Sequence, residues 1–229
     1  MKRKQSLIAV FILLLIAHLL CIYTELELWR AVTKLLLVPL LVTYLLLSQD
    51  KFNWKIRPVY ALFFSFLGDA LLIGKGPVFF LSGMISFVLA HLNFSYYFIQ
   101  LSPVQKSTKQ LFLLPLILML VFSATVYTFL ENYLGAYQLP VVFYMLFISL
   151  MASLAIHTFS NPAIKQIAIK YFAPGAVLFV LSDAILALNL FRFHEPLLDL
   201  AVMFTYGLAQ CLLTIGFAKT FVIVGPTEN

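Results

Sequence analysis

Charged residues are scarce in this sequence. Asp, Glu, Lys and Arg make up 10% of its 229 residues, whereas 63% of the residues are hydrophobic. A typical soluble domain carries about 25% charged residues. A chain this poor in charge cannot cover the surface of a soluble domain of its size. The composition therefore excludes that class and favours a membrane protein.

Cysteine is nearly absent as well, with two residues in the chain. Cys21 and Cys211 fall in the first and last apolar segments, where we interpret them as small hydrophobic residues rather than a disulfide or a metal pair. The sequence also lacks an HExxH, CxxC, P-loop, GxGxxG or nucleophile-elbow motif in a usable context. A zinc protease, a nucleotide enzyme and a serine hydrolase therefore have no local support.

Long apolar segments are what the sequence has instead. About 20 apolar residues span a bilayer as a helix, and eight stretches of this kind are separated by short polar breaks. They are continuously apolar and rich in Leu, unlike the alternating strands of a membrane barrel. The sequence predicts an all-α polytopic membrane bundle that forms one domain over residues 1–229. The eight predicted transmembrane helices lie near 6–23, 29–47, 57–74, 78–100, 110–130, 138–158, 170–190 and 197–222.

The basic residues indicate how this bundle lies in the membrane. In an eight-helix arrangement eleven of the fifteen fall on one side, and by the positive-inside rule this side and both termini are cytoplasmic. We therefore expect an integral protein of the bacterial cytoplasmic membrane, with membrane lipids rather than nucleic acid as partners of its +6 net charge. The basic start resembles a signal peptide, but Leu19-Leu20-Cys21 lacks the small residues that a peptidase requires. The eleven residues are Lys2, Arg3, Lys4, Lys51, Lys55, Arg57, Lys106, Lys109, Lys165, Lys170 and Lys219.

Two aspartates lie inside segments that are otherwise typical of a membrane interior. Asp69 lies in the apolar run 63–73, and Asp183 lies in the run 179–186. An aspartate at the centre of a membrane helix costs about 2.5–3.5 kcal/mol, so such residues usually face a bundle interior or a wet cavity. Counting along the predicted helices places both in the outer half of the bilayer. We expect the two acids to form one site.

The surroundings of the two acids suggest an internal repeat. The acids lie four predicted helices apart, so the two halves of the chain run in the same direction. Pro77 precedes His91 by fourteen residues, and Pro196 precedes Gln210 by fourteen. This spacing suggests a parallel four-plus-four pseudo-repeat, which would place the acids across a pseudo-twofold axis.

Polar side chains in the other segments are candidates for supporting the acids. Gly83, Phe87 and His91 follow a four-residue spacing and share one helical face. Lys34 lies about one turn inside the second segment, where a lysine can extend to the interface, hold the phosphate of a lipid or pair with a buried acid. The candidate supporting residues are Lys34, Ser65, His91, Tyr96, Tyr144, Ser182, Asn189, Tyr206 and Gln210.

Two carboxylates in an apolar cleft suit acid and base catalysis. They repel each other and lose solvation, so one can remain protonated near neutral pH while the other ionises. Glycosidases use such a pair to cleave a carbon–oxygen bond through an oxocarbenium-like state. Two alternatives stay open at this stage. One is a proton-coupled transporter of a small or lipidic substrate, and the other is a pair of acids that serves only packing.

Several of these residues belong to a longer pattern. It consists of Ser65-Phe66-Leu67-Gly68-Asp69-Ala70-Leu71, of Gly83 through Phe87 to His91 and Tyr96, of Gly175 to Asp183, and of Tyr206 through Gln210. In this pattern the chain resembles the YhhN family of eight-helix membrane proteins, whose characterised members are lysoplasmalogenases, over nearly its whole length. One departure is that Lys34 is followed by Leu35 where the family has Pro, and proline arrives only at Pro39.

The resemblance implies hydrolysis of the sn-1 vinyl-ether bond of a lysoplasmalogen, giving a fatty aldehyde and glycerophosphoethanolamine or glycerophosphocholine. Asp69 and Asp183 are then the candidate catalytic residues. The sequence does not assign the acid and base roles between them, and Asp69 as the base with Asp183 as the acid is our working assignment. His91, Tyr206 and Gln210 would position water or the headgroup. The partners are then a lysophospholipid substrate and membrane lipids, and the chemistry needs no metal or other cofactor.

Overall fold

A computed structural model of the chain describes residues 2–48 and 56–223. Within these residues every regular element is a helix, and six segments are long and apolar enough to cross a membrane. The prediction of an all-α, polytopic helical membrane protein is therefore confirmed. The six segments are Gln5–Tyr23, Glu27–Leu46, Pro77–Leu101, Lys106–Ser160, Lys165–Phe193 and Pro196–Ile223.

Each predicted span overlaps a long helix of the structure. These helices are α1 (Lys2–Tyr23), α2 (Glu27–Leu46), α3 (Arg57–Leu71), α4 (Pro77–Leu101), α5 (Lys109–Leu134), α6 (Gln138–His157), α8 (Ala173–Leu188) and α9 (Pro196–Ile223). The segment 106–160 contains both α5 and α6, joined by a 3₁₀ turn at Gly135–Tyr137. The helix that carries Asp69, α3, has 15 residues and rises only about 22 Å at 1.5 Å per residue, which is shorter than a full span.

Proline marks the start of the helices that carry the candidate site. Pro58 and Pro174 lie in the first turns of α3 and α8, and Pro77 and Pro196 begin α4 and α9. A first-turn proline has the backbone angle of a helix and lacks only an N–H that has no helical partner there. Before α4, Gly76 has a φ of 104°, which glycine adopts without strain, and the resulting tight turn lays α3 beside α4.

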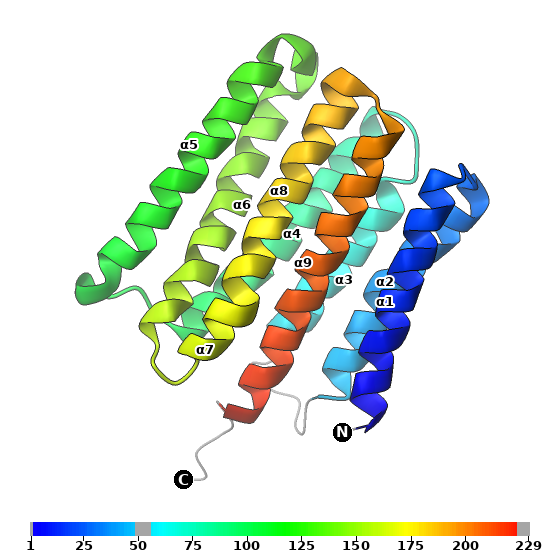
Figure 1. The fold of residues 1–229 in the computed structure, drawn as a ribbon. Coiled ribbons are helices and arrows are strands. Elements are labelled where there is room, and N and C mark those ends of the chain that lie inside the picture. The colour runs from blue at the N-terminus through cyan, green and yellow to red at the C-terminus, as the bar shows by residue number, and fades with distance from the viewer. Residues whose placement is uncertain (1, 49–55, 224–229) are drawn as a thin grey trace.

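Helices that are neighbours in sequence pack as hairpins: α1 with α2, α3 with α4, α5 with α6, and α8 with α9 (Figure 1). Contacts of α9 with α1 and α2, and of α6 with α4 and α8, join the hairpins into one bundle. The start of α1 and the end of α9 lie at the same end, which we call the terminal end, and we call the opposite one the far end (Figure 1). Lys51 and Lys55, on which the predicted orientation partly depends, lie outside the described residues.

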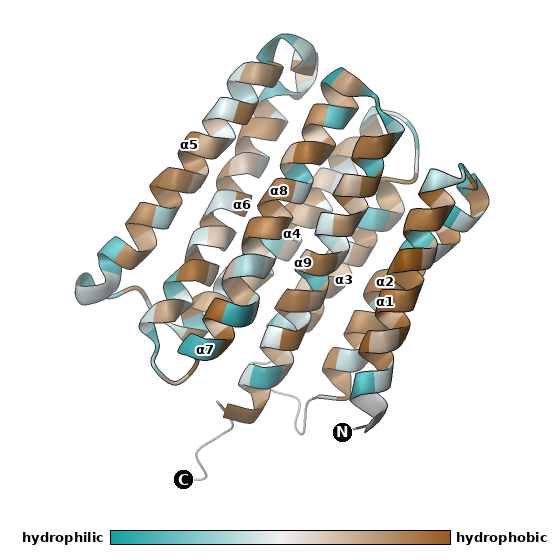
Figure 2. Ribbon diagram, in the orientation of Figure 1, coloured by the Kyte–Doolittle hydropathy of each residue, from teal (hydrophilic) through white to brown (hydrophobic). Residues whose placement is uncertain are grey.

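Aromatic side chains pack the half of the bundle near the terminal end. Phe217 of α9 stacks on Phe94 of α4 and contacts Phe98 and Phe172, and all four side chains are fully buried. Hydrophobic residues also predominate along the outside of the helices (Figure 2), where Leu114 of α5 is 63% exposed. Exposed apolar side chains over a whole helical face are typical of a surface that lipid covers.

Candidate functional site

A cavity of about 720 Å³ lies toward the far end of the bundle, and both Asp69 and Asp183 line it. Apolar side chains such as Phe87 and Val180 make up most of its wall, and the turn 74–77 lies at its rim. An apolar cavity of this size with a few converging polar groups is typical of a small-molecule site. The charged residues that line it are Arg30, Lys34, Asp69, Lys75, Asp183 and Asp199.

Asp69 is almost completely buried and has a cation beside it. Its Oδ1 lies 3.5 Å from Nζ of Lys34 on α2. The hydroxyl of Tyr206 on α9 donates a hydrogen bond of 2.7 Å to Oδ2, and Nε2 of Gln210 donates to that hydroxyl at 3.1 Å. The Lys34 side chain is 18% exposed and the Asp69 side chain 4%. Three helices therefore meet at Asp69, and the ammonium of Lys34 balances the charge of its ionised form.

Asp183 lies in a less buried and differently balanced environment. The hydroxyl of Tyr144 on α6 donates a hydrogen bond of 2.5 Å to Asp183 Oδ2. Nε2 of His91 on α4 lies 3.1 Å from the Tyr144 hydroxyl and 3.9 Å from the same carboxylate oxygen. Among the described residues no lysine or arginine pairs with Asp183, and its side chain is 15% exposed. The two acids of the cavity thus differ in charge environment, as an acid and base pair requires.

Aromatic rings hold the partners of both acids in place. Phe179 of α8 contacts the rings of His91 at 4.9 Å and Tyr206 at 5.5 Å between centroids, both edge to face. Phe87 contacts Tyr206 and Phe179 in the same manner. Edge-to-face contacts of this kind fix ring orientation and add about 0.5–1.5 kcal/mol each beyond the burial of area. Rotation of the Tyr206 and His91 side chains is therefore restricted.

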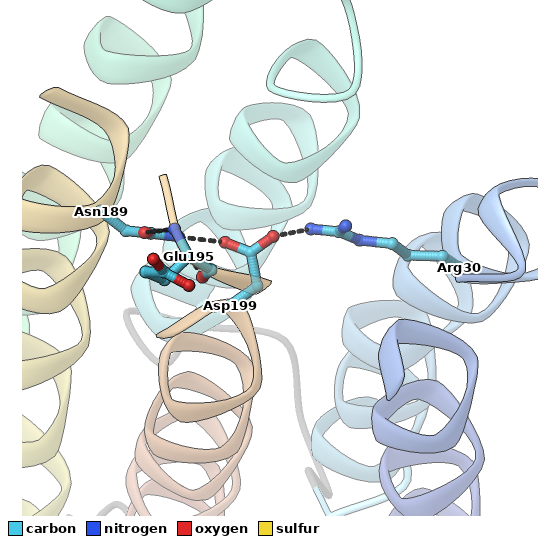
Figure 3. Close-up of polar contacts among 4 residues, drawn as sticks. All are labelled: Arg30, Asn189, Glu195 and Asp199. Atoms are coloured by element: carbon cyan, nitrogen blue, oxygen red, sulfur yellow. Dashed lines mark hydrogen bonds and ion pairs between the residues drawn. The ribbon is translucent and has the colours of Figure 1, made fainter. Parts of the chain in front are cut away.

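A second pair of opposite charges lies at the mouth of the cavity. Nη2 of Arg30 is 2.7 Å from Oδ2 of Asp199, and Asn189 Nδ2 donates a hydrogen bond of 2.7 Å to Oδ1 (Figure 3). Asn189 is itself held by the backbone of Glu195, which donates to Asn189 Oδ1 at 2.7 Å and accepts from Nδ2 at 3.1 Å. The ion pair between Arg30 and Asp199 therefore joins α2 to the first turn of α9.

The family model for YhhN proteins matches residues 29–217 of the chain. The chain belongs to the YhhN family. The matched region contains every charged residue that lines the cavity, from Arg30 to Asp199, as well as Tyr206 and Gln210. The family resemblance predicted from the sequence is therefore confirmed.

Two curated relatives resemble this YhhN-family protein. The lysoplasmalogenase TMEM86A of Bos taurus is 31% identical over 166 residues, which cover 72% of this chain and 66% of the relative. The lysoplasmalogenase TMEM86B of Rattus norvegicus is 32% identical over 170 residues, covering 74% of this chain and 64% of the relative. The chain thus spans just under two thirds of the length of these relatives. No solved structure matches it.

Of the supporting residues predicted from the sequence, some line the cavity of the YhhN-family protein and others lie one contact behind it. The side chains of Lys34, Tyr144, Ser182 and Tyr206 belong to the lining. His91 and Gln210 lie behind, where each contacts the tyrosine that donates to an aspartate. Of the roles considered for Lys34, the structure has it paired with a buried acid.

Three predicted supporting residues do not reach the cavity. Ser65 is buried and donates within its own helix to the carbonyl of Ala61. Tyr96 is 47% exposed, and the guanidinium of Arg57 lies over its ring. Tyr96 follows His91 by five positions, which at 3.6 residues per turn rotates it well away from the face of that histidine. Asn189 acts at the mouth, through Asp199.

The sequence interpretation missed the pair at the mouth. The sequence analysis did not select Arg30 as a site residue, because charged residues are ordinary near the ends of membrane helices. One signal could have identified it: Arg30 precedes Lys34 by four residues, so the two cations share a face of α2. No such signal pointed to Asp199.

Among the described residues, no group of three His, Cys, Asp or Glu side chains is placed to hold a metal ion.

Gly68→Ala is expected to destabilise the YhhN-family protein, because a Cβ at this position would lie 2.6 Å from Cε2 of Phe87. The Phe87 ring would have to move against Tyr206 and Phe179, which it contacts edge to face. Overpacking of this kind costs about 1–3 kcal/mol. The melting temperature of the purified protein measures the effect. Adding Phe87→Leu should restore most of the loss, and an unchanged melting temperature for Gly68→Ala alone would contradict the close contact.

Proposed function

We propose that this protein is a lysoplasmalogenase, which hydrolyses the sn-1 vinyl-ether bond of lysoplasmalogens. The products are a fatty aldehyde and glycerophosphoethanolamine or glycerophosphocholine. The observation that carries the proposal is that Asp69 and Asp183 line one apolar cavity with different partners, one beside a lysine and the other beside a tyrosine and a histidine. The similarity to two lysoplasmalogenases supports the choice of reaction.

We propose that the bundle crosses the membrane eight times, with both termini cytoplasmic and the cavity in the outer half. The start of α1 and the end of α9 lie at one end of the bundle, which supports an even number of crossings (Figure 1). In this arrangement α3 is a short crossing, and the turn that follows it forms part of the mouth. The excess of basic residues in the segments at the terminal end supports this orientation.

The partners of the acids support the parallel pseudo-repeat. Asp69 of the first half bonds to Tyr206 of α9, whereas Asp183 of the second half lies beside His91 of α4. Each acid is thus supported by the last helix of the opposite half. A pseudo-twofold axis between the two halves would produce this exchange, which is typical of sites built at a repeat interface.

In the proposed reaction Asp183 is the acid. A vinyl ether is hydrolysed by proton transfer to its β-carbon, which leaves an oxocarbenium ion. Among the described residues no lysine or arginine pairs with Asp183, whereas Lys34 lies beside Asp69, so the proposal gives the role of proton donor to Asp183. The Tyr144 hydroxyl donates to one carboxyl oxygen and leaves the other free to carry the proton. Proton transfer by a positioned side chain contributes about 10²–10⁴-fold to rate.

Asp69 is the base in this proposal. The ammonium of Lys34, 3.5 Å away, supplies a counter-charge for the carboxylate, and the Tyr206 hydroxyl donates a hydrogen bond to it. A carboxylate at this position stabilises the oxocarbenium ion and takes a proton from the water that attacks its α-carbon. The hemiacetal that forms then collapses to the aldehyde. Asp69 returns its proton to the sn-1 oxygen, which leaves as the alcohol of the glycerophospholipid product, and the proton of the hemiacetal hydroxyl passes to Asp183. Water thus supplies the oxygen of the aldehyde, and both acids return to their starting states.

The purified protein in detergent is expected to release a fatty aldehyde from an alkenyl lysophospholipid in the absence of any ion gradient. The cavity holds one alkyl chain against its apolar wall, and the two acids act on the enol ether. A saturated lysophospholipid should remain intact, because it has no enol ether to protonate. Aldehyde is measured with a coupled dehydrogenase.

Two outcomes of this assay would contradict the proposal. Cleavage of the saturated lysophospholipid at the same rate would describe an ester or general lipid hydrolase. Absence of aldehyde, together with uptake of substrate that depends on a proton gradient in vesicles, would favour a proton-coupled transporter that uses the same aspartates.

A further inference from the structure

The ion pair at the mouth of the cavity offers one group of each charge to a ligand. Arg30 and Asp199 both line the cavity, and their nearest atoms are 2.7 Å apart (Figure 3). Asn189 holds Oδ1 of Asp199, so the carboxylate keeps its position if Arg30 moves. Lys75 adds a second, exposed cation to the lining at this level. The mouth therefore combines a fixed anion with cations on flexible side chains.

The cost of opening an ion pair decides which of the two pairs can admit a ligand. The side chains of Arg30 and Asp199 are 42% and 28% exposed, and ion pairs that water reaches contribute little to stability. The side chains of Lys34 and Asp69 are 18% and 4% exposed, and breaking an ion pair that is largely shielded from water is costly. Arg30 can therefore exchange its partner for a phosphate at little cost, whereas Lys34 is held by Asp69.

The position of Arg30 also suits a phosphate. Arg30 precedes Lys34 by four residues on α2, so it lies about 6 Å nearer the far end along the helix axis. A substrate whose ether oxygen lies at the two acids has its phosphate only a few covalent bonds away, across the glycerol. That distance is on the order of one helical turn. A guanidinium binds phosphate in a bidentate manner, which a lysine cannot do.

We propose that Arg30 and Asp199 form a subsite for a zwitterionic phospholipid headgroup, an inference that rests on the proposed function and assigns the residues that bind its headgroup. Arg30 binds the phosphate, Lys75 adds a second cation to the same lining, and Asp199 binds the ammonium group. In the absence of a ligand the two side chains neutralise each other. With a ligand, each charge at the mouth meets the opposite charge of the headgroup. An anionic headgroup that draws Arg30 away leaves the charge of Asp199 without a cationic partner at the mouth, and a lipid without a phosphate leaves the pair intact.

Binding of lysolipids that cannot react tests the subsite without catalysis. The full-length protein in detergent is titrated with saturated lysophosphatidylethanolamine, with lysophosphatidylglycerol and with monoacylglycerol. Asp199→Asn is expected to weaken binding of lysophosphatidylethanolamine about tenfold, because the ammonium group loses its carboxylate. The same variant should not weaken binding of lysophosphatidylglycerol. Arg30→Gln is expected to weaken binding of both phospholipids about tenfold. Monoacylglycerol has no phosphate, so the wild-type protein and all variants should bind it with the same affinity.

Matched controls separate the subsite from a general effect of charge. Arg192 lies over the ring of Phe129 outside the cavity lining, and Glu131 is exposed at the end of α5. Arg192→Gln and Glu131→Gln make the same charge changes and should leave all three affinities unchanged. Melting temperatures confirm that each variant is folded. The subsite proposal would be overturned if Arg30→Gln or Asp199→Asn weakened the binding of all three lipids equally. It would also be overturned if neither variant weakened binding.

The same experiment separates the subsite from the proposed reaction. Headgroup-selective binding without aldehyde release would keep the subsite and contradict the hydrolase. Aldehyde release whose headgroup preference is unaffected by Asp199→Asn would keep the hydrolase and contradict the subsite. Displacement of the lysolipid by an equal concentration of diacyl phosphatidylethanolamine would assign the mouth to bulk membrane lipid, and would overturn its role in substrate binding.

Discussion

Asp183→Asn is expected to lower kcat for aldehyde release by about a thousandfold, the range that loss of a general acid produces. Asparagine has the same shape, but it has no proton of suitable acidity to transfer to the vinyl ether. The Tyr144 hydroxyl can still donate to the amide oxygen, so the hydrogen bond that positions the side chain is preserved. The fold should therefore tolerate the change. Turnover and melting temperature, measured on the same preparation, test both parts.

Tyr144→Phe distinguishes this role from simple positioning. It removes the donor to Asp183 and the partner of His91 but leaves the carboxyl group in place. Activity should fall less than in Asp183→Asn. Glu131→Gln, outside the cavity, serves as the control for removal of an acid. Asp183→Asn with wild-type turnover would exclude Asp183 as the acid.

Asp69→Asn is expected to abolish activity and also to destabilise the protein, unlike the change at Asp183. Without its carboxylate the site has no base, and the ammonium of Lys34, whose side chain is only 18% exposed, loses its counter-charge. Removing one partner of a buried pair costs about 3–5 kcal/mol. The melting temperature in detergent should therefore fall by several degrees, while turnover falls to background.

A second variant separates the two effects of this substitution. Lys34→Met combined with Asp69→Asn removes both charges and keeps an apolar stem in place of the lysine. The melting temperature should recover toward wild type, whereas activity should not. Such non-additivity is the expected signature of a direct pair. If Asp69→Asn alone melts at the wild-type temperature, the Lys34 contact does not stabilise the protein.

Composition and the cost of buried charge predicted much of this molecule. A chain with 10% charged residues must be largely buried in lipid, and every predicted span overlaps a helix. Asp69 and Asp183 stood out because a charge within an apolar run is costly enough to require a reason. The cavity that both acids line follows from the same requirement.

The partners of the acids were harder to predict, because they depend on which helices pack together. Lys34 and Asp69 come from α2 and α3, and Tyr144 and Asp183 from α6 and α8. Hydrophobic periodicity is weak in helices that are apolar on all sides, so it does not indicate the direction in which each face points. Arg30 and Asp199 were missed for a different reason: near helix ends a charge needs no special explanation.

The contacts of α9 have a consequence for how the protein is made. Helices enter the membrane in the order of synthesis, so Lys34 can meet Asp69 as soon as α3 has been inserted. Arg30 and Asp199 are 169 residues apart, and Tyr206 and Asp69 are 137 apart. Both contacts must wait for the last long helix. Until α9 is inserted, Arg30 lacks Asp199 and Asp69 lacks the Tyr206 hydroxyl, so the last long helix to be made is the one that completes both ends of the site.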